Sequence, residues 1–246
     1  HGLGATGLLN WRPVFETLAQ NYRVLVVDHR GHGRGMRMRS HFRLADCADD
    51  VAALTDQLGV ERFVAVGYSM GGPIAQLLWQ RHRSRVDGLV LCATACRFTS
   101  TDRRRMSWAF SPLLNVAGRL APRRTIRRMA LQWLSDAITD PAIRERVLSE
   151  VGSSDPVTLG QAAAAVARFD STAWAGEIDV PTSVVLTERD RLVPANNQRA
   201  MADQIRGAVV HSVPGDHSVC VTRPAIFVPA LADACISVVR RAGEAP

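Results

Sequence analysis

Short apolar runs alternate with helix-like segments along this chain, and that alternation restricts the possible folds more than any other feature. Five runs rich in β-branched residues have the pattern of buried strands: 22–28, 63–67, 86–93, 182–186 and 208–213. Helices are expected between and after them, at about 13–21, 44–58, 72–82, 195–205 and 224–241. Near-continuous apolar strands suit a parallel sheet that is covered on both faces. We therefore expect an α/β fold with a mostly parallel, doubly wound sheet.

The alternation stops once, between residues 97 and 176, where the sequence predicts helices only. At about 150 residues per domain, a chain of 246 residues forms one large domain or a domain with an insertion. We predict a core formed by residues 1–96 and 177–246, with residues 97–176 inserted as a helical cap.

The composition excludes several other classes of protein. With 47% hydrophobic and 22% charged residues, the chain resembles an ordinary globular domain and not a disordered one. No apolar stretch approaches the roughly 20 residues that a transmembrane helix needs. The five cysteines are odd in number and scattered, so we expect reduced thiols in a cytoplasmic protein, without a disulfide or zinc framework.

The sequence Gly67-Tyr68-Ser69-Met70-Gly71 lies between a predicted strand and a predicted helix. Such a G-x-S-x-G turn is sharp, and its glycines relieve the crowding where strand and helix meet. The turn exposes the serine hydroxyl at the carboxyl edge of the sheet, which predicts Ser69 as a nucleophile. A turn of small residues that only serves close packing is the alternative interpretation.

A serine hydroxyl needs a general base that is itself oriented by a carboxylate. Asp190 and His217 each lie in the loop that follows one of the last two predicted strands. Because parallel strands end at the same edge of a sheet, Ser69, Asp190 and His217 are expected to meet there. Glu188 is the alternative acid, whereas Asp216 is adjacent to His217 in sequence and is poorly placed to orient its ring.

The order serine, aspartate, histidine after successive strands resembles that of the α/β-hydrolase fold family. Two further segments are similar to motifs of this family. His1-Gly2-Leu3-Gly4 resembles its His-Gly oxyanion loop, and Asp28-His29-Arg30-Gly31-His32-Gly33 resembles its D-x-R-G-x-G turn. The segment from Asp190 to Pro194 also fits a D-x-x-V-P stretch that follows the acid. The resemblance covers nearly the whole chain except the predicted cap.

The resemblance implies an oxyanion hole formed by the backbone N–H groups of Leu3 and Met70, and it implies no metal or organic cofactor. The family also places a strand directly before the His-Gly pair, so we expect the first strands of the fold to be absent from this chain. Two residues depart from the family pattern: Thr187 stands where glycine is common, and Gly35 stands where serine is common.

The resemblance implies a serine hydrolase that cleaves carboxylic ester bonds of small molecules through an acyl-enzyme. A lactonase, a carbon–carbon bond hydrolase, and a cofactor-free peroxidase or lyase use the same triad, and these alternatives stay open. A serine nucleophile disfavours the dehalogenase and epoxide hydrolase chemistry of the family. A binding module without catalysis is less consistent with an intact serine, acid and histidine.

One motif favours a different class of enzyme. Gly2-Leu3-Gly4-Ala5-Thr6-Gly7 matches the G-x-G-x-x-G fingerprint of dinucleotide binding, and Asp28 follows at the spacing of a ribose ligand. We expect the first helix to begin only near Pro13, which would leave the third glycine outside it. An NAD(P)-binding oxidoreductase would also leave the serine, acid and histidine without a role.

The predicted cap supplies the candidate substrate-binding residues. Bulky apolar side chains are frequent there, and four of them are expected to line the roof of the pocket: Met106, Trp108, Phe110 and Trp133. Apolar residues at helical spacing more often only pack a helix onto a core, which is the alternative interpretation. A roof of this kind favours a hydrophobic acyl or aromatic substrate.

The positive charge of the chain is unevenly distributed. All 30 basic residues are arginines, and the formal net charge is +7. Residues 97–130 hold nine arginines and one acid, and residues 30–43 hold five arginines and no acid, so the remainder of the chain is acidic. No nucleic-acid-binding motif accompanies these arginines. A basic cap that contacts an anionic membrane surface is the alternative to a solvated face, and the sequence predicts no oligomeric state.

Overall fold

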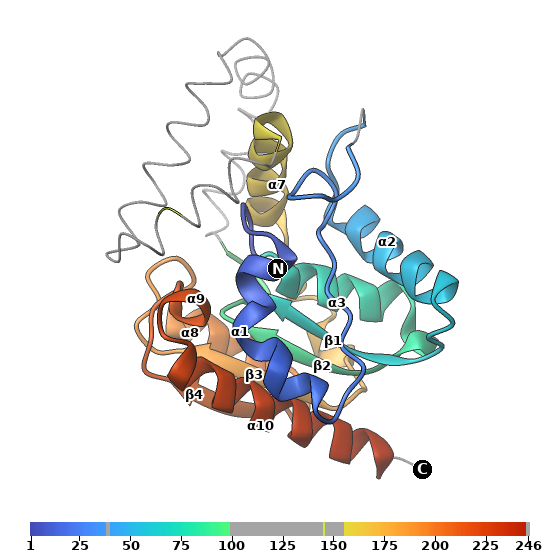
Figure 1. The fold of residues 1–246 in the computed structure, drawn as a ribbon. Helices are drawn as coiled ribbons and strands as arrows, with labels where there is room; N and C mark the ends of the chain where they lie inside the picture. Colours follow the sequence, from blue (N-terminus) through green and yellow to red (C-terminus); the bar gives the residue numbers. More distant parts are fainter. Residues whose placement is uncertain (38–39, 99–144, 146–154, 245–246) are drawn as a thin grey trace.

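The computed structural model describes residues 1–37, 40–98, 145 and 155–244, whose core is a parallel sheet (Figure 1). The sheet has the order β1-β2-β3-β4, formed by Phe63–Tyr68, Val86–Cys92, Thr182–Thr187 and Val209–Val213. The helices are α1 Gly7–Ala19, α2 Leu44–Gln57, α3 Gly71–Arg81, α7 Pro156–Arg168, α8 Ala195–Gln204, α9 Val219–Thr222 and α10 Pro224–Gly243. The expected α/β fold with a mostly parallel sheet is confirmed.

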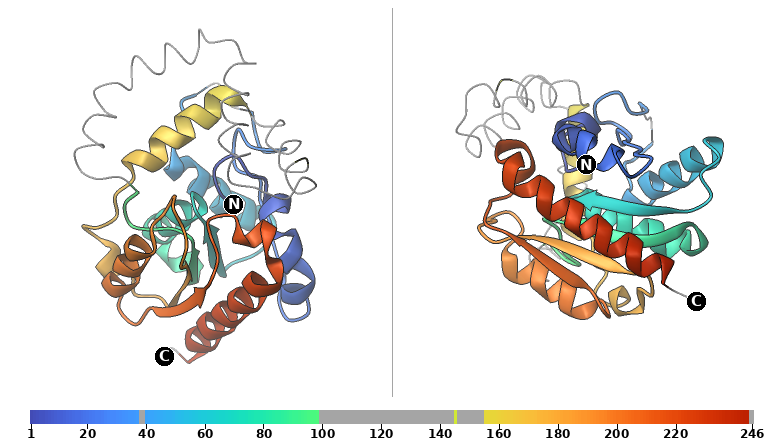
Figure 2. Two further views of the ribbon diagram at one scale, coloured as in Figure 1. Left: turned by 90° about the vertical axis from the view of Figure 1, so that its left-hand side faces the viewer. Right: turned by 60° about the horizontal axis from the view of Figure 1, so that its bottom comes forward.

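Helices cover both faces of the sheet, which is why its strands are apolar at nearly every position. Helices α1 and α10 pack on one face, and helices α2, α3 and α8 pack on the other (Figures 1 and 2). The side chains of strand β2 alternate between these two faces. Leu89 and Leu91 are completely buried in the core on the α3 side, whereas Val90 and Cys92 are completely buried in the core on the α10 side.

Helix α1 begins at Gly7, well before the expected start near Pro13. Thr6 caps the helix, because its hydroxyl accepts a hydrogen bond from the Leu9 N–H group at 3.1 Å. Pro13 therefore lies inside the helix. The expected start was wrong because the proline was taken to mark the first turn. The other four predicted helices lie close to their expected positions.

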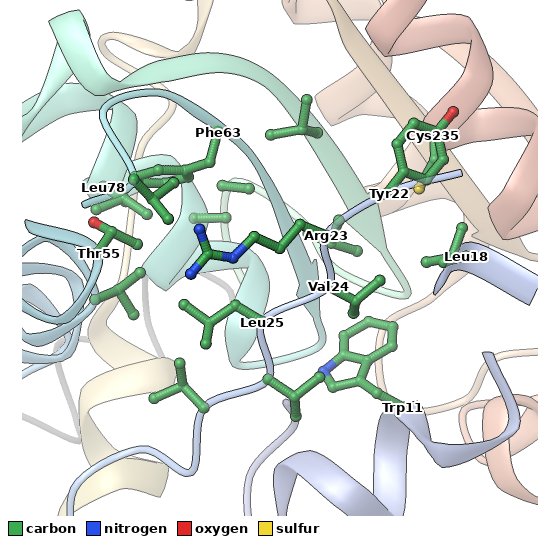
Figure 3. Close-up of a pocket in the computed structure, with 18 of the residues that line it drawn as sticks. Trp11, Leu18, Tyr22, Arg23, Val24, Leu25, Thr55, Phe63, Leu78 and Cys235 are labelled. Carbon is green, nitrogen blue, oxygen red and sulfur yellow. The ribbon is translucent and has the colours of Figure 1, made fainter. Parts of the chain in front are cut away.

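The segment from Tyr22 to Asp28 was expected to be a strand, but it pairs with no described strand. Its residues 22–27 line one side of a cavity of about 630 Å³, and Phe63–Val66 of β1 line the other side. Figure 3 shows side chains of this segment and Trp11 of α1 around the cavity. A strand needs a neighbour at hydrogen-bond distance, and the cavity separates the two backbones. Within the described residues β1 pairs only with β2.

The predicted cap lies only partly within the described residues. Its last part contains α7, and an isolated antiparallel bridge joins Arg97 to Asp170 near the two ends of the predicted insertion. The four predicted substrate-binding residues lie outside the described residues: Met106, Trp108, Phe110 and Trp133. The division into core and cap therefore stays a prediction. None of the helices in the described part of the chain is long and apolar enough to cross a membrane.

Candidate active site

Three strands deliver the predicted serine, acid and base to the same edge of the sheet. Ser69 directly follows β1, Asp190 lies in the loop after β3, and His217 lies between β4 and α9. All neighbouring strands are parallel, so their carboxyl ends lie on one side of the molecule. The three residues are far apart in the sequence, but they lie close together at this edge of the sheet.

The turn at Ser69 forces this residue into an unusual backbone conformation, with a φ of 51°. Hydrogen bonds hold it on both sides: its N–H group donates to the Cys92 carbonyl oxygen, and its carbonyl oxygen accepts from the Thr94 hydroxyl, each at 2.9 Å. The turn is also tightly packed, because a Cβ atom on Gly67 would lie 2.2 Å from the Gly71 carbonyl oxygen. Glycine at position 67 is therefore needed for the sharp bend at the serine.

The three side chains form a continuous line of hydrogen bonds. His217 Nδ1 lies 2.7 Å from Asp190 Oδ2, and His217 Nε2 lies 2.9 Å from Ser69 Oγ. An ionised carboxylate can only accept, so Nδ1 carries the proton and donates to Asp190. The other ring nitrogen is then an acceptor, and the Ser69 hydroxyl donates its proton to it. This arrangement places a hydrogen-bond acceptor on the hydroxyl of the half-buried serine.

Asp190 is kept ionised by its surroundings although its side chain is fully buried. Burial alone would raise its pKa, but the hydrogen bond and charge of His217 outweigh this effect, assisted by Val193 and Thr187, and the pKa is lowered. Oδ1 accepts hydrogen bonds from the N–H groups of Leu192 and Val193, both at 2.9 Å. Oδ2 accepts from the Thr187 hydroxyl at 2.8 Å. The carboxylate therefore has donors on both oxygens.

Two of the residues that support the acid were not predicted from the sequence. Gln198 on α8 is completely buried, and its Nε2 atom donates to Thr187 Oγ1 at 2.8 Å and to the Val193 carbonyl oxygen at 2.7 Å. Its Oε1 atom accepts from the Thr187 N–H group at 3.1 Å. Thr187 was noticed only as a departure from the glycine of the family. Gln198 has no local sequence signal, since the fold alone brings α8 to this loop.

The rival acids do not face His217. Glu188 is exposed at the end of β3, and the Asp216 carboxylate accepts hydrogen bonds from the N–H group and hydroxyl of Ser218, at 2.8 and 2.7 Å. The structure therefore places Asp190, and neither rival, against the imidazole.

The predicted oxyanion donors belong to two segments that meet at the serine: Met70 follows Ser69 in the chain, and a Cβ atom on Gly2 would lie 3.4 Å from Ser69 Cβ. The N–H groups of Leu3 and Met70 have no hydrogen-bond partner within the described part of the chain. The carbonyl group of Gly2 accepts from the Ala5 N–H group at 3.2 Å and from His1 Nδ1 at 2.8 Å. This carbonyl and the Leu3 N–H group belong to one planar peptide and point in opposite directions. Anchoring the carbonyl therefore fixes the direction of the Leu3 N–H group.

The glycine pattern of a dinucleotide site has another explanation in the structure. Gly7 does lie where α1 meets residues 26–28, contrary to our expectation, and a Cβ atom on it would lie 2.4 Å from Val26. However, Asp28 is already occupied: its Oδ1 accepts from the Gly7 N–H group at 2.7 Å and its Oδ2 from the Arg34 N–H group at 2.9 Å. The carboxylate that would bind a ribose therefore closes a loop of its own chain.

Comparison with known proteins agrees with this geometry. Residues 1–129 match the alpha/beta hydrolase fold family. A protein of Caulobacter sp. (strain K31), provisionally named carbamate hydrolase RutD, is 30% identical over 92% of this chain and 85% of its own length. The pimeloyl-[acyl-carrier protein] methyl ester esterase of Chromobacterium violaceum is 31% identical over 95% of this chain and 91% of its own length.

The similarity extends to solved structures. A thermophilic esterase from Thermogutta terrifontis superposes with a TM-score of 0.81 at 26% identity, covering 97% of this chain and 88% of the esterase. The sequence matches, the parallel sheet and the sharp turn at its edge all lead to the same assignment. The chain belongs to the alpha/beta hydrolase fold family.

Proposed function

We propose that this protein is a serine hydrolase that cleaves the carboxylic ester bond of a small molecule. The observation that carries the proposal is the line of hydrogen bonds from Ser69 Oγ through His217 to Asp190, with distances of 2.9 and 2.7 Å. A base on the hydroxyl and a carboxylate on the base are the two requirements for making serine a nucleophile.

The first half of the reaction transfers the acyl group to the enzyme. Ser69 Oγ attacks the ester carbonyl carbon while its proton passes to His217 Nε2, and Asp190 stabilises the resulting imidazolium. The tetrahedral oxyanion accepts hydrogen bonds from the N–H groups of Leu3 and Met70, and one such donor is worth about 3 kcal/mol in comparable sites. Collapse of the intermediate expels the alcohol, which leaves with the proton from His217.

The second half releases the acid. A water molecule attacks the acyl-enzyme carbonyl while His217 takes one of its protons. The second tetrahedral intermediate breaks the bond to Ser69 Oγ, and His217 returns the proton to the serine. Every proton is accounted for by one imidazole, so this chain's own residues suffice for each step.

The relatives suggest two kinds of acyl group. An ester is the substrate named for the Chromobacterium relative, and a carbamate is the one named for the Caulobacter relative. Both contain a carbonyl carbon that Ser69 can attack. Esters are the first candidate here, because the nitrogen of a carbamate donates electrons into its carbonyl group and makes the carbon less reactive toward Ser69 than an ester carbon. Carbamates are the second candidate.

The hydrophobic acyl or aromatic substrate expected from the cap remains part of the proposal. Replacing Met106 or Trp133 by alanine should change the preference for acyl chain length. Unchanged preference in both variants would contradict a role of these residues in the pocket.

Hydrolysis of a panel of p-nitrophenyl esters from acetate to decanoate tests the proposal, with a p-nitrophenyl carbamate and a simple lactone included. The wild type should hydrolyse at least one ester, and Ser69→Ala should lose activity by about 10⁴-fold or more. The control is Ser84→Ala, because Ser84 is exposed and lies in the short Arg83–Arg85 helical turn. Undiminished activity of Ser69→Ala would contradict the proposal.

A further inference from the structure

Three buried polar side chains lie next to the site without a part in the proposed chemistry. They are Asn10 on α1, Tyr68 at the end of β1 and Cys220 on α9, with relative exposures of 3%, 2% and 2%. We refer to these residues as the Asn10 cluster. Burying a polar group costs free energy unless it is paired, and apolar side chains would fill the same space. The partners of the cluster therefore indicate its role.

Asn10 bridges the oxyanion loop and the helix that follows the histidine. Its Oδ1 atom accepts a hydrogen bond from the Gly2 N–H group at 2.8 Å, and its Nδ2 atom donates to Cys220 Sγ at 3.1 Å. The Gly2 N–H group lies one peptide before the Leu3 N–H group. Together with the anchored Gly2 carbonyl, Asn10 fixes two successive peptides of this loop.

Tyr68 connects the serine turn with the histidine. It precedes Ser69 in sequence, and its hydroxyl donates to the His217 carbonyl oxygen at 2.8 Å. The Tyr68 and His217 rings lie 5.8 Å apart in a tilted arrangement. The backbone of the histidine is thus tied directly to the residue before the nucleophile.

Cys220 completes the connection between the other two members. Burial raises the pKa of its thiol to about 11, although hydrogen bonds with Tyr68 and Asn10 act in the opposite direction. The group is therefore a neutral thiol at physiological pH, suited to a polar contact inside the protein rather than to nucleophilic attack.

We propose that Asn10, Tyr68 and Cys220 are positioning residues that hold the His1–Leu3 loop and His217 in place relative to Ser69, an inference that rests on the proposed function of this site. The cluster joins the elements that carry the nucleophile, the base and one oxyanion donor. Displacement of such groups by about 1 Å can reduce the rate of the chemical step roughly 100-fold. A buried network that spans these elements opposes such displacement.

Asn10→Leu and Tyr68→Phe test the proposal, since each keeps the approximate shape of the side chain and removes its hydrogen bonds. We expect kcat to fall about 10- to 100-fold, with KM changed less than about threefold. The matched control is Ser171→Ala. Ser171 is fully buried and donates to Gln76 Oε1 at 2.6 Å, a bond that joins α3 to the segment after α7. The control should lower Tm by about 2 to 4 °C, as the test variants do, and leave kcat within about twofold.

Hydrogen exchange gives a second measurement that does not depend on activity. Amides of residues 1–10 and 214–222 should exchange faster in Asn10→Leu than in the wild type, whereas Ser171→Ala should leave both segments unchanged. If the wild type is active but kcat or exchange is unchanged in Asn10→Leu and Tyr68→Phe, the positioning role is overturned. The proposed function would not be affected by that result. A wild type that is inactive on every ester would instead contradict the proposed function, and the exchange data would still decide on the cluster.

Discussion

At the scale of single residues, the charge on one buried carboxyl group determines the protonation of the whole site. The lowered pKa of Asp190 keeps it ionised at neutral pH, which requires a proton on His217 Nδ1 and leaves Nε2 free to accept from Ser69. Thr187 and Gln198 contribute to this state through the hydrogen bond to Oδ2. Residues that do not contact His217 can therefore control which of its ring nitrogens accepts from Ser69.

Thr187→Val tests this support for the acid. The variant should lower the free energy of unfolding at pH 7 by about 1 to 3 kcal/mol, because Asp190 and Gln198 each lose a buried partner. A lowered pKa contributes stability that is fully present above the ordinary value of 3.8 and is lost as the pH falls through the folded value. Since the variant raises the folded pKa of Asp190, its deficit should shrink at pH 3. Urea unfolding at both pH values measures this.

The control for that experiment is Thr172→Val. The Thr172 hydroxyl donates to Asp170 Oδ1 at 2.6 Å in an exposed pair, so its loss should change the free energy of unfolding by less than about 0.5 kcal/mol. A Thr187→Val deficit that is equally small, or equal at both pH values, would contradict the support that we assign to Thr187.

At the scale of elements, the turn from β1 to α3 carries the strain of the site. Ser69 has a positive φ, and the glycines around it bring the strand and the helix into close contact. A Cβ atom on Gly72 would lie 2.1 Å from Thr94 Oγ1, so the start of α3 also packs tightly against the residues after β2. The conformation of Ser69 therefore depends on small residues in two neighbouring elements.

Gly67→Ala should disrupt this turn. The added Cβ atom would lie 2.2 Å from the Gly71 carbonyl oxygen, a backbone atom that cannot move without displacing α3. We expect a loss of at least about 2 kcal/mol in unfolding free energy and loss of ester hydrolysis. Gly160→Ala is the matched control, because a Cβ atom there meets nothing within 4 Å in α7. It should stabilise the protein by about 0.4 to 1 kcal/mol, and equal stability of the two variants would refute the steric account.

At the scale of the whole molecule, the features that could be predicted from the sequence are those that depend on local patterns of residues. Apolar runs located all four strands of the described sheet, and the residues around Ser69 located the sharp turn between β1 and α3. Thr6 and Pro13 are both typical of a helix start, and helix α1 begins directly after Thr6. Residues 22–28 have the composition of a strand, but they pair with no strand in the described part of the chain. Composition alone does not show whether a neighbouring strand is present. Contacts that only the fold creates, such as that of Asn10 with Cys220, could not be predicted.

Three histidine rings, those of His1, His29 and His32, meet near the site, and two of them couple the stability of the protein to pH. His1 lies 4.5 Å from His29 and 5.2 Å from His32 between ring centroids. Burial lowers the pKa of His32 to about 4 and that of His29 well below 6.5. Both rings are thus neutral in the folded protein, whereas the unfolded chain binds protons near pH 6.5. Stability should be constant above that pH and fall as the pH drops toward 4.

His32→Phe checks this dependence, because it keeps a ring and removes one titrating group. The fall in Tm between pH 7 and pH 5 should be smaller in the variant than in the wild type, and His41→Gln, at an exposed position, should behave as the wild type does. Equal pH dependence in His32→Phe and the wild type would show that the His32 ring does not cause the fall in Tm.

Covalent labelling by a fluorophosphonate tests the central claim most directly, because the reagent traps an activated serine whatever the natural substrate is. The Ser69 oxygen forms a bond to phosphorus, fluoride leaves, and the hydroxyl proton passes to His217. Mass spectrometry of the intact protein and its peptides should find one adduct, on Ser69, in the wild type and in Ser84→Ala. Labelling should be absent in Ser69→Ala and strongly slowed in His217→Ala. A wild type that is not labelled, or an adduct that persists in Ser69→Ala, would contradict the account.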